Sequence, residues 1–282
     1  MHKIGIHLSY WQESWSDELI PIFDRVKTAG FDVAELPLLN PRIMDFSSLA
    51  VGLEQAGLLP SCGTGLGPET DITSPDQSIR AAGIDHLRAC LEGAARLGSP
   101  ILGGVTYAPW GFFPDDNRVD RRTRCIESLG AAADYAASVG VVLCIEVLNR
   151  FEGYLLNTVD QGLALLAEVG SPGLKLHLDT FHMNIEEDNL PDAILRAGGR
   201  LGHFHCVANN RKAPGDGHLD WGAIRSALKA IGYYGYLVAE SFVNPVGEVG
   251  HDLFIWRQLS GDLDKNAARI AKFIKNEVAF GF

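Results

Sequence analysis

The sequence lacks the features that mark membrane and secreted proteins. All of its apolar runs stop short of the roughly 20 residues that a membrane-spanning helix requires. Its beginning reads directly as a strand, whereas a secretion signal would show a charged start, a long apolar core and a small-residue cleavage site. We therefore expect a cytoplasmic protein without a membrane partner.

Cysteine is scarce, and no two cysteines form a C-x-x-C pair. Structural zinc sites and disulfide frameworks use paired or regularly spaced cysteines, so both are disfavoured. We expect the cysteines to be small buried residues in a reducing compartment. They are Cys62, Cys90, Cys125, Cys144 and Cys206.

Basic residues are also in deficit, with 24 Lys and Arg against 35 Asp and Glu, which gives a formal charge of −11. Affinity for nucleic acid depends mainly on basic side chains that neutralise phosphates, so a nucleic-acid partner is disfavoured. With 46% hydrophobic residues in a chain of 282, one large globular domain spanning residues 1–282 is expected.

A unit of apolar strand, loop and amphipathic helix recurs along the chain. Parallel strands need helical crossovers, so this alternation predicts an α/β fold, a (β/α)8 TIM barrel. The rival fold, a doubly wound sheet, would usually carry a glycine-rich turn after the first strand, and residues 8–12 contain none. The expected strands are 3–8, 33–36, 58–63, 101–107, 141–147, 174–179, 201–207 and 236–242. The expected helices are 17–29, 45–56, 75–97, 118–139, 158–169, 190–197, 221–231 and 263–277.

Four of the expected strands each end in one ionisable side chain. These are Glu146, Asp179, His205 and Glu240, at spacings of 33, 26 and 35 residues, about one βα unit each. The carboxyl ends of barrel strands form the active-site mouth, so these side chains should converge there. One such residue alone would be an ordinary buried polar group. Three buried carboxylates and an imidazole together would repel each other without a cation, which predicts a metal site.

The predicted ligand set is hard and rich in oxygen. It suits Mn²⁺ or Mg²⁺ better than structural zinc and leaves positions open for water or substrate. Strand alternation places His177 and His203 on the same interior face, one pleat deeper. We interpret both as interior groups that support the site rather than as metal ligands.

Loops after the strands add groups that could bind a small polyhydroxylated ligand. Glu152, His182 and Arg211 follow the fifth, sixth and seventh strands. Aromatic residues in the first and fourth loops could face a sugar or exclude water from the site. Residues 108–114 are too apolar for an ordinary solvated loop and favour a lid or a subunit contact. The aromatic residues are Trp11, Trp15, Tyr107, Trp110, Phe112 and Phe113.

Several segments resemble the ketose 3-epimerases, the D-tagatose and D-psicose 3-epimerase family of sugar isomerase TIM barrels. The strongest likeness is in residues 144–152 (CIEVLNRFE), 178–187 (LDTFHMNIEE), 202–205 (GHFH), 209–211 (NNR) and 214–215 (PG). Weaker likeness occurs at residues 9–11, 74–76 and 256–257. The resemblance therefore spans nearly the whole chain.

This resemblance implies a metal-dependent isomerase that epimerises a free ketose at C3, of the D-psicose/D-fructose, D-tagatose/D-sorbose or L-ribulose type. It implies that Glu146, Asp179, His205 and Glu240 bind one divalent metal, usually Mn²⁺, with Mg²⁺ or Co²⁺ as alternatives. Glu146 and Glu240 would also move the C3 proton, through a metal-stabilised cis-enediolate. Glu152, His182 and Arg211 match contacts to the O1–O3 end of the sugar, and His7, Trp15 and Trp110 are further candidate substrate contacts. A homodimer or homotetramer is usual in the family.

Two residues depart from the family pattern. Ala208 stands three residues after the candidate metal histidine, where glutamate is usual, and His7 ends the first strand, where an aromatic residue is frequent. Both keep open a related enediolate enzyme, such as an aldose–ketose isomerase, an inosose-type enzyme or an enzyme acting on an oxidised glycoside. A non-catalytic sugar-binding module is a third possibility.

A more remote alternative is an endonuclease IV-like DNA-cleaving enzyme on the same barrel. The spacings Asp216-Gly217-His218 and Asp179-x-x-His182 faintly resemble its ligands. Three zinc ions would need further histidines near the third and fourth strands, and residues 61–68 and 101–112 contain none. The acidic charge of the chain also disfavours DNA.

Overall fold

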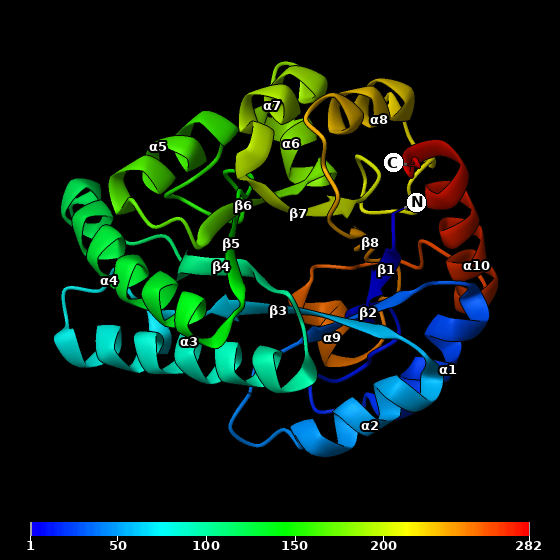
Figure 1. The fold of residues 1–282 in the computed structure, drawn as a ribbon, viewed down its shortest axis with the longest axis horizontal. Coiled ribbons are helices and arrows are strands. Elements are labelled where there is room, and N and C mark those ends of the chain that lie inside the picture. Colours follow the sequence, from blue (N-terminus) through cyan, green and yellow to red (C-terminus); the bar gives the residue numbers. More distant parts are fainter. Residues whose placement is uncertain (1, 282) are drawn as a thin grey trace.

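The computed structural model describes residues 2–281, which form a closed barrel of eight parallel strands in chain order. Figure 1 shows the strands around the centre and the helices outside them. The predicted (β/α)8 TIM barrel is confirmed. The strands are β1 Ile4–His7, β2 Val33–Pro37, β3 Leu59–Leu66, β4 Ile101–Pro109, β5 Val142–Glu146, β6 Leu174–Asp179, β7 Leu201–Cys206 and β8 Leu237–Ala239.

The helices between the strands begin and end at local signals in the sequence. Asp76 accepts a hydrogen bond from the backbone N–H of Ser78 and caps the start of α3, which ends at Gly98 with a φ of 77°. Asn117 and Gly140 do the same for α4. The helices are α1 Ile20–Ala29, α2 Phe46–Ala56, α3 Gln77–Leu97, α4 Arg118–Val139, α5 Val159–Val169, α6 Thr180–Glu186, α7 Leu190–Ala197, α8 Trp221–Ala230, α9 Gly247–Asp252 and α10 Leu263–Phe273.

Each strand directs alternate side chains outward to the helices and inward to the barrel axis. Leu176 in β6 faces outward, because a Cβ added to Gly162 of α5 would lie 2.8 Å from its side chain. His177, its neighbour, faces inward, where it would lie 3.2 Å from a Cβ added to Gly103 of β4. The interior near the carboxyl ends is therefore polar, while the layer between strands and helices forms the apolar core.

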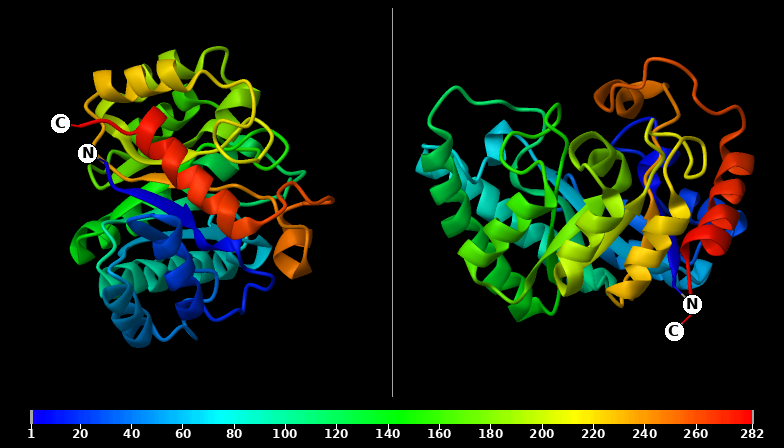
Figure 2. Two further views of the ribbon diagram at one scale, coloured as in Figure 1. Left: turned by 90° about the vertical axis from the view of Figure 1, so that its right-hand side faces the viewer. Right: turned by 90° about the horizontal axis from the view of Figure 1, so that it is seen from above.

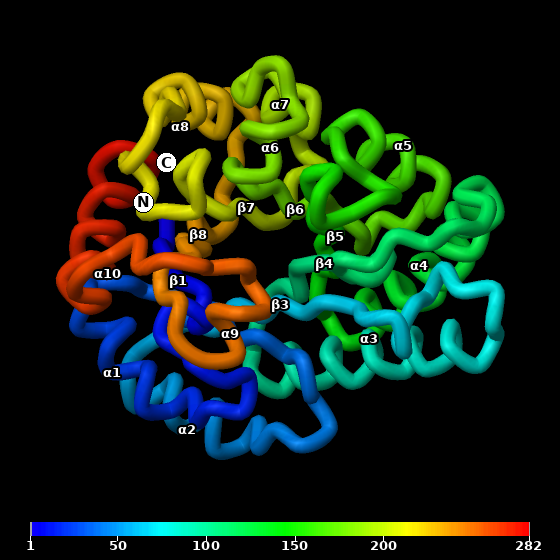
Figure 3. Tube along the Cα trace, turned by 180° about the vertical axis from the view of Figure 1, so that it is seen from behind, coloured from blue at the N-terminus to red at the C-terminus, as the bar shows by residue number. Residues whose placement is uncertain are grey.

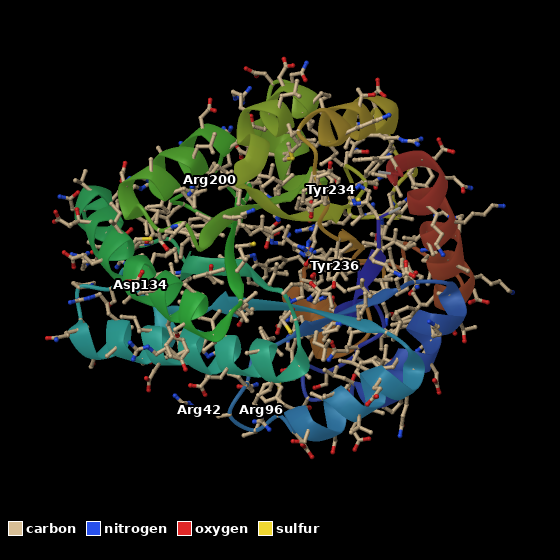
Figure 4. The ribbon with its side chains drawn as sticks, viewed as in Figure 1. Arg42, Arg96, Asp134, Arg200, Tyr234 and Tyr236 are labelled. Atoms are coloured by element: carbon tan, nitrogen blue, oxygen red, sulfur yellow. The ribbon has the colours of Figure 1, made fainter. Side chains whose placement is uncertain are left out.

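The two ends of the barrel differ. The right-hand view of Figure 2 shows both chain termini at one end and α9 at the other. Figure 3, from behind, shows α9 and its flanking loops in front of β1 and β3. Tyr236, which directly precedes β8, lies near the centre of the view in Figure 4, at the amino end of the strands. The carboxyl ends of the strands therefore open on the side of α9.

Some element boundaries differ from those expected. The strand before Glu240 ends at Ala239, so this side chain follows the strand rather than ending it. Residues 180–186, expected as loop, form α6, because the Asp179 side chain caps the backbone N–H of Phe181. Tyr107 lies within β4 and not in the fourth loop. Among the described residues, none of the helices is both long and apolar enough to cross a membrane.

Candidate active site

A cavity of about 570 Å³ opens at the carboxyl ends of the strands. The strands β1 to β7, and Glu240 directly after β8, contribute to its wall or floor, and α9 with the loop that follows covers part of its rim. This is the position at which TIM barrels carry their active sites. The lining residues that lie in the strands or directly after them include His7, Glu35, Gly63, Gly104, Glu146, His177, His205 and Glu240.

The four predicted metal ligands meet at the bottom of this cavity. Glu146, Asp179, His205 and Glu240 each offer one ligand atom, and these atoms all lie within 4.8 Å of one another. Nδ1 of His205 is 3.6 Å from Oδ2 of Asp179 and 3.5 Å from Oε2 of Glu240. The first three side chains are buried and Glu240 is nearly so. The structure thus brings together residues that the sequence places on four separate units.

The imidazole of His205 is oriented to bind a cation. Its Nε2 lies 2.7 Å from Oε1 of Glu35, and a carboxylate only accepts, so Nε2 carries a proton. Nδ1 then turns toward the carboxylates, and it is a buried atom without a hydrogen-bond partner in the described chain. Burial alone lowers the pKa of His205, but the carboxylates of Glu240 and Glu35 outweigh it and raise the pKa. A positive charge at Nδ1 is therefore favoured, and a divalent ion fits this donor set.

The two glutamates of this cluster differ in the protonation state that they favour. Burial, followed by the nearby carboxylate of Glu240, raises the pKa of Glu146 well above its usual range. The pKa of Glu240 is lowered, because His205 outweighs the effect of burial. One member of the glutamate pair therefore favours the protonated form and the other the ionised form.

Arg211 is held against the same carboxylates. Its Nη1 donates to Oδ2 of Asp179 at 3.1 Å and to Oε2 of Glu240 at 3.0 Å. The guanidinium lies between the rings of Phe181 and Phe242, at 4.0 and 4.5 Å from their centroids. These stacked rings fix its plane and leave its edge available to the cavity. Arg211 thus joins the predicted metal site to the predicted sugar contacts.

His182 lies beside Arg211 and brings a second nitrogen to the same part of the cavity. The backbone N–H of Asn149 donates to Nδ1 of His182 at 3.1 Å, so Nε2 carries the proton of the neutral ring. That Nε2 lies 3.0 Å from Nη2 of Arg211. With this tautomer the Arg211 contact brings two N–H donors together instead of making a hydrogen bond, so an oxygen atom of a ligand would have to accept from both.

Glu152 completes this corner of the cavity. It accepts hydrogen bonds from Nε1 of Trp110 at 3.1 Å and from Nδ2 of Asn149 at 2.9 Å. Burial favours its protonated form, but Arg211 and His182 outweigh burial and lower the pKa of Glu152. The result is an ionised acceptor next to two donors, an arrangement suited to neighbouring hydroxyl groups.

Of the other predicted aromatic residues, some line the cavity and some lie outside it. Trp15 lines the cavity and its indole N–H donates to Asp252 of α9 at 3.0 Å. Trp11 is buried and its indole N–H donates to Asp264 at the start of α10, outside the cavity. Phe112 and Phe113 are partly exposed beyond the end of β4, so the role of residues 108–114 as lid or subunit contact stays a prediction.

Glu35 is a site residue that the sequence analysis did not identify. Besides His205, its carboxylate lies 2.7 Å from Nε2 of His203 and accepts a hydrogen bond of 2.5 Å from Ser61. His177, which accepts from the N–H of Gly104 at 3.2 Å, packs beside both histidines. A signal was present, because Glu35 is the one charged residue in the buried run of β2. Its side chain supports the candidate metal ligand from beneath.

Comparisons with known proteins agree with this geometry. Residues 23–275 match the family described as the xylose isomerase-like TIM barrel. A D-psicose 3-epimerase from Agrobacterium fabrum is 37% identical, over 99% of this chain and 97% of that protein. An L-ribulose 3-epimerase from Methylomonas sp. is 35% identical, over 97% of this chain and 96% of that protein.

A solved structure gives the same result in three dimensions. A D-psicose 3-epimerase crystallised in the presence of D-fructose superposes with a TM-score of 0.94 at 36% identity, over 98% of this chain and 99% of that chain. The agreement extends over the strands and the loops that form the cavity, since almost none of either chain is left unmatched. The chain belongs to the xylose isomerase-like TIM barrels and, within them, to the ketose 3-epimerase family of carbohydrate isomerases.

Proposed function

We propose that this protein epimerises a free ketose at C3, with a divalent metal ion bound by Glu146, Asp179, His205 and Glu240. The observation that carries the proposal is the meeting of these four ligand atoms within 4.8 Å, next to the hydrogen-bonding groups of Arg211, His182 and Glu152. The similarity to enzymes named D-psicose and L-ribulose 3-epimerase supports a ketose as substrate.

The proton at C3 would be moved by the two glutamates. Glu146 comes from β5 and Glu240 follows β8, so their carboxylates can reach the substrate from two directions. The ionised glutamate would remove the proton and the protonated one would return a proton to the opposite face of C3. Their roles exchange when the reaction runs in reverse.

A bound Mn²⁺, or Mg²⁺ or Co²⁺ in its place, would supply Lewis acidity that stabilises negative charge on the enediolate oxygens. The side chains of the chain would do the positioning. Arg211 and His182 would donate to oxygens at the O1–O3 end of the ketose, and Glu152 would accept from a hydroxyl there. Trp110 would hold Glu152 in place through its indole N–H. Trp15 and His7 would contact the other end of the sugar, away from O1. A homodimer or homotetramer in the cytoplasm stays a prediction.

The direct test is epimer formation by protein stripped of metal with a chelator and then reloaded with Mn²⁺. D-fructose, D-psicose, D-tagatose and L-ribulose are offered, and products are identified by NMR. The proposal expects the C3 epimer of at least one sugar, only after reloading. Activity that is unchanged by metal removal, or no product from any ketose, would contradict it.

Substitution of the two glutamates tests their joint role as metal ligands and carriers of the C3 proton. Glu146→Gln and Glu240→Gln should each lower kcat by at least about 10²-fold, because general acid–base catalysis contributes about 10²–10⁴-fold. Glu54→Gln, at an exposed position of α2, is the matched control and should behave as wild type. Near-normal kcat in either site variant would contradict the scheme of two glutamates.

A further inference from the structure

A second polar group faces the cavity from β1, away from the corner formed by Arg211, His182 and Glu152. His7 ends this strand and lines the cavity, and its Nε2 would lie 3.9 Å from a Cβ added to Gly63 of β3. Ser9 and Trp15 line the same side. The cavity therefore has two polar regions, one above β4 to β7 and one above β1 to β3.

The tautomer of His7 is determined by its neighbours. The backbone N–H of Ser9 donates to Nδ1 at 3.3 Å, and the Oγ of Ser9 lies 2.6 Å from the same atom. Nδ1 is therefore the acceptor of the ring, and the proton of the neutral imidazole is on Nε2. The same contact caps the short turn Leu8–Tyr10, so the ring is attached to the backbone at a fixed angle.

The Nε2–H of His7 has no acceptor among the described residues, although the ring is mostly enclosed. Both hydrogen bonds that the His7 side chain makes with the described residues use Nδ1. A fixed donor that points into a cavity and lacks a partner is suited to an oxygen of a ligand. A hydroxyl group can satisfy it, whereas a methylene group in the same place would leave the donor without a bond.

We propose that His7 is a specificity-determining residue that donates from Nε2 to a hydroxyl on the C4–C6 part of the ketose. This inference rests on the proposed function. With C2 and C3 between Glu146 and Glu240 and the O1 end at Arg211, the rest of the sugar extends toward β1. His7 then selects ketoses that carry a hydroxyl at one position of that part over the deoxy analogues that lack it.

The test combines variants of His7 with deoxy substrates in a double-mutant cycle. The values of kcat/KM for a parent ketohexose and its 4-, 5- and 6-deoxy analogues are measured with wild type, His7→Phe and His7→Gln, all loaded with Mn²⁺. His7→Phe keeps a ring but removes the donor. His7→Gln places an amide N–H near the position of Nε2 and is the conservative control. Mn²⁺ affinity and the melting temperature are measured for each variant.

The proposal expects a selective loss. His7→Phe should lower kcat/KM for the parent sugar by about ten-fold, the size of one neutral hydrogen bond, and should have little effect on the analogue that lacks the contacted hydroxyl. His7→Gln should stay within about three-fold of wild type for the parent. If His7→Phe does not fold, Ser9→Ala, which removes the Oγ contact to Nδ1 and keeps the backbone contact, should give a smaller loss with the same dependence on the hydroxyl.

Equal losses for every analogue, or no loss with the parent, would overturn the role of His7 while leaving the epimerase proposal intact. A wild-type protein that epimerises no ketose would overturn the proposed function, and the role of His7 with it. The two failures are distinguished by the activity of the wild type alone.

Discussion

Replacement of Glu35 by glutamine should weaken metal binding although Glu35 is not itself a predicted ligand. The carboxylate of Glu35 requires a proton on Nε2 of His205, which leaves the lone pair of Nδ1 for the cation. An amide of the same size has one acceptor and one donor group. It cannot accept from His205, His203 and Ser61 together, and its N–H₂ group can turn toward an imidazole nitrogen. His205 can then carry its proton on Nδ1, where it blocks the metal.

The expected loss is about 10- to 100-fold in the dissociation constant for Mn²⁺, the range seen when a supporting partner of a ligand is changed. That corresponds to about 1.4 to 2.7 kcal/mol. Glu35 is almost fully buried, and its carboxylate lies 2.7 Å from both histidines, so solvent cannot replace it. The pKa of Glu35 is well below its usual range, because the two histidines outweigh the effect of burial, and the ionised form is the one that the variant removes.

Isothermal titration of chelator-stripped protein with MnCl₂ measures this loss without any substrate. Glu54→Gln serves as the surface control, and the melting temperature without metal shows whether Glu35→Gln remains folded. Wild-type affinity in a folded Glu35→Gln variant would refute the reasoning, because His205 would then keep its orientation without the carboxylate.

Three further predictions test other parts of the site and the fold. Arg211→Ala should raise KM for the ketose by at least about ten-fold in steady-state kinetics, because a charged donor to the sugar is lost. An unchanged KM would remove Arg211 from the substrate site. Mn²⁺ affinity should rise with pH, because the raised pKa values of Glu146 and His205 mean that the metal must displace protons from its ligands. A flat pH profile by titration would contradict this. In wild type, Nη1 of Arg121 lies 2.7 Å from Oδ2 of Asp71, and both side chains are buried. Arg121→Met leaves the Asp71 carboxylate buried without this cation and should lower the free energy of unfolding, measured in urea, by about 3–5 kcal/mol. A loss below about 1 kcal/mol would contradict this.

The barrel and the meeting of the four candidate ligands could be predicted from the sequence, because both depend on local pattern. The strands that carry Glu146, Asp179 and His205 are largely apolar runs with an ionisable residue at or next to the carboxyl end. Barrel topology then brings such ends together without further information. Glu35 carries a similar signal, but it lies in the middle of its strand rather than at the end.

The remaining features depend on contacts between distant segments. Arg211 is held by rings from Phe181 and Phe242, and its φ of 61° is a backbone state that sequence pattern does not predict. The helix α6 is too short to show a clear periodicity in the sequence. Its N-cap, Asp179, is also a predicted metal ligand, so the residue does not by itself signal the start of a helix. The Nδ1 contact of His7 depends on the turn at Ser9, which spacing alone does not determine.

Proton exchange in D₂O is the most direct test of metal-dependent proton transfer at C3 of a ketose. Protein reloaded with Mn²⁺ is incubated with a reactive ketose, and the signals of C1 and C3 are followed by NMR. We expect metal-dependent incorporation of deuterium at C3 together with the appearance of the C3 epimer. Deuterium at C1, or an epimer formed without deuterium at C3 and without metal, would contradict it.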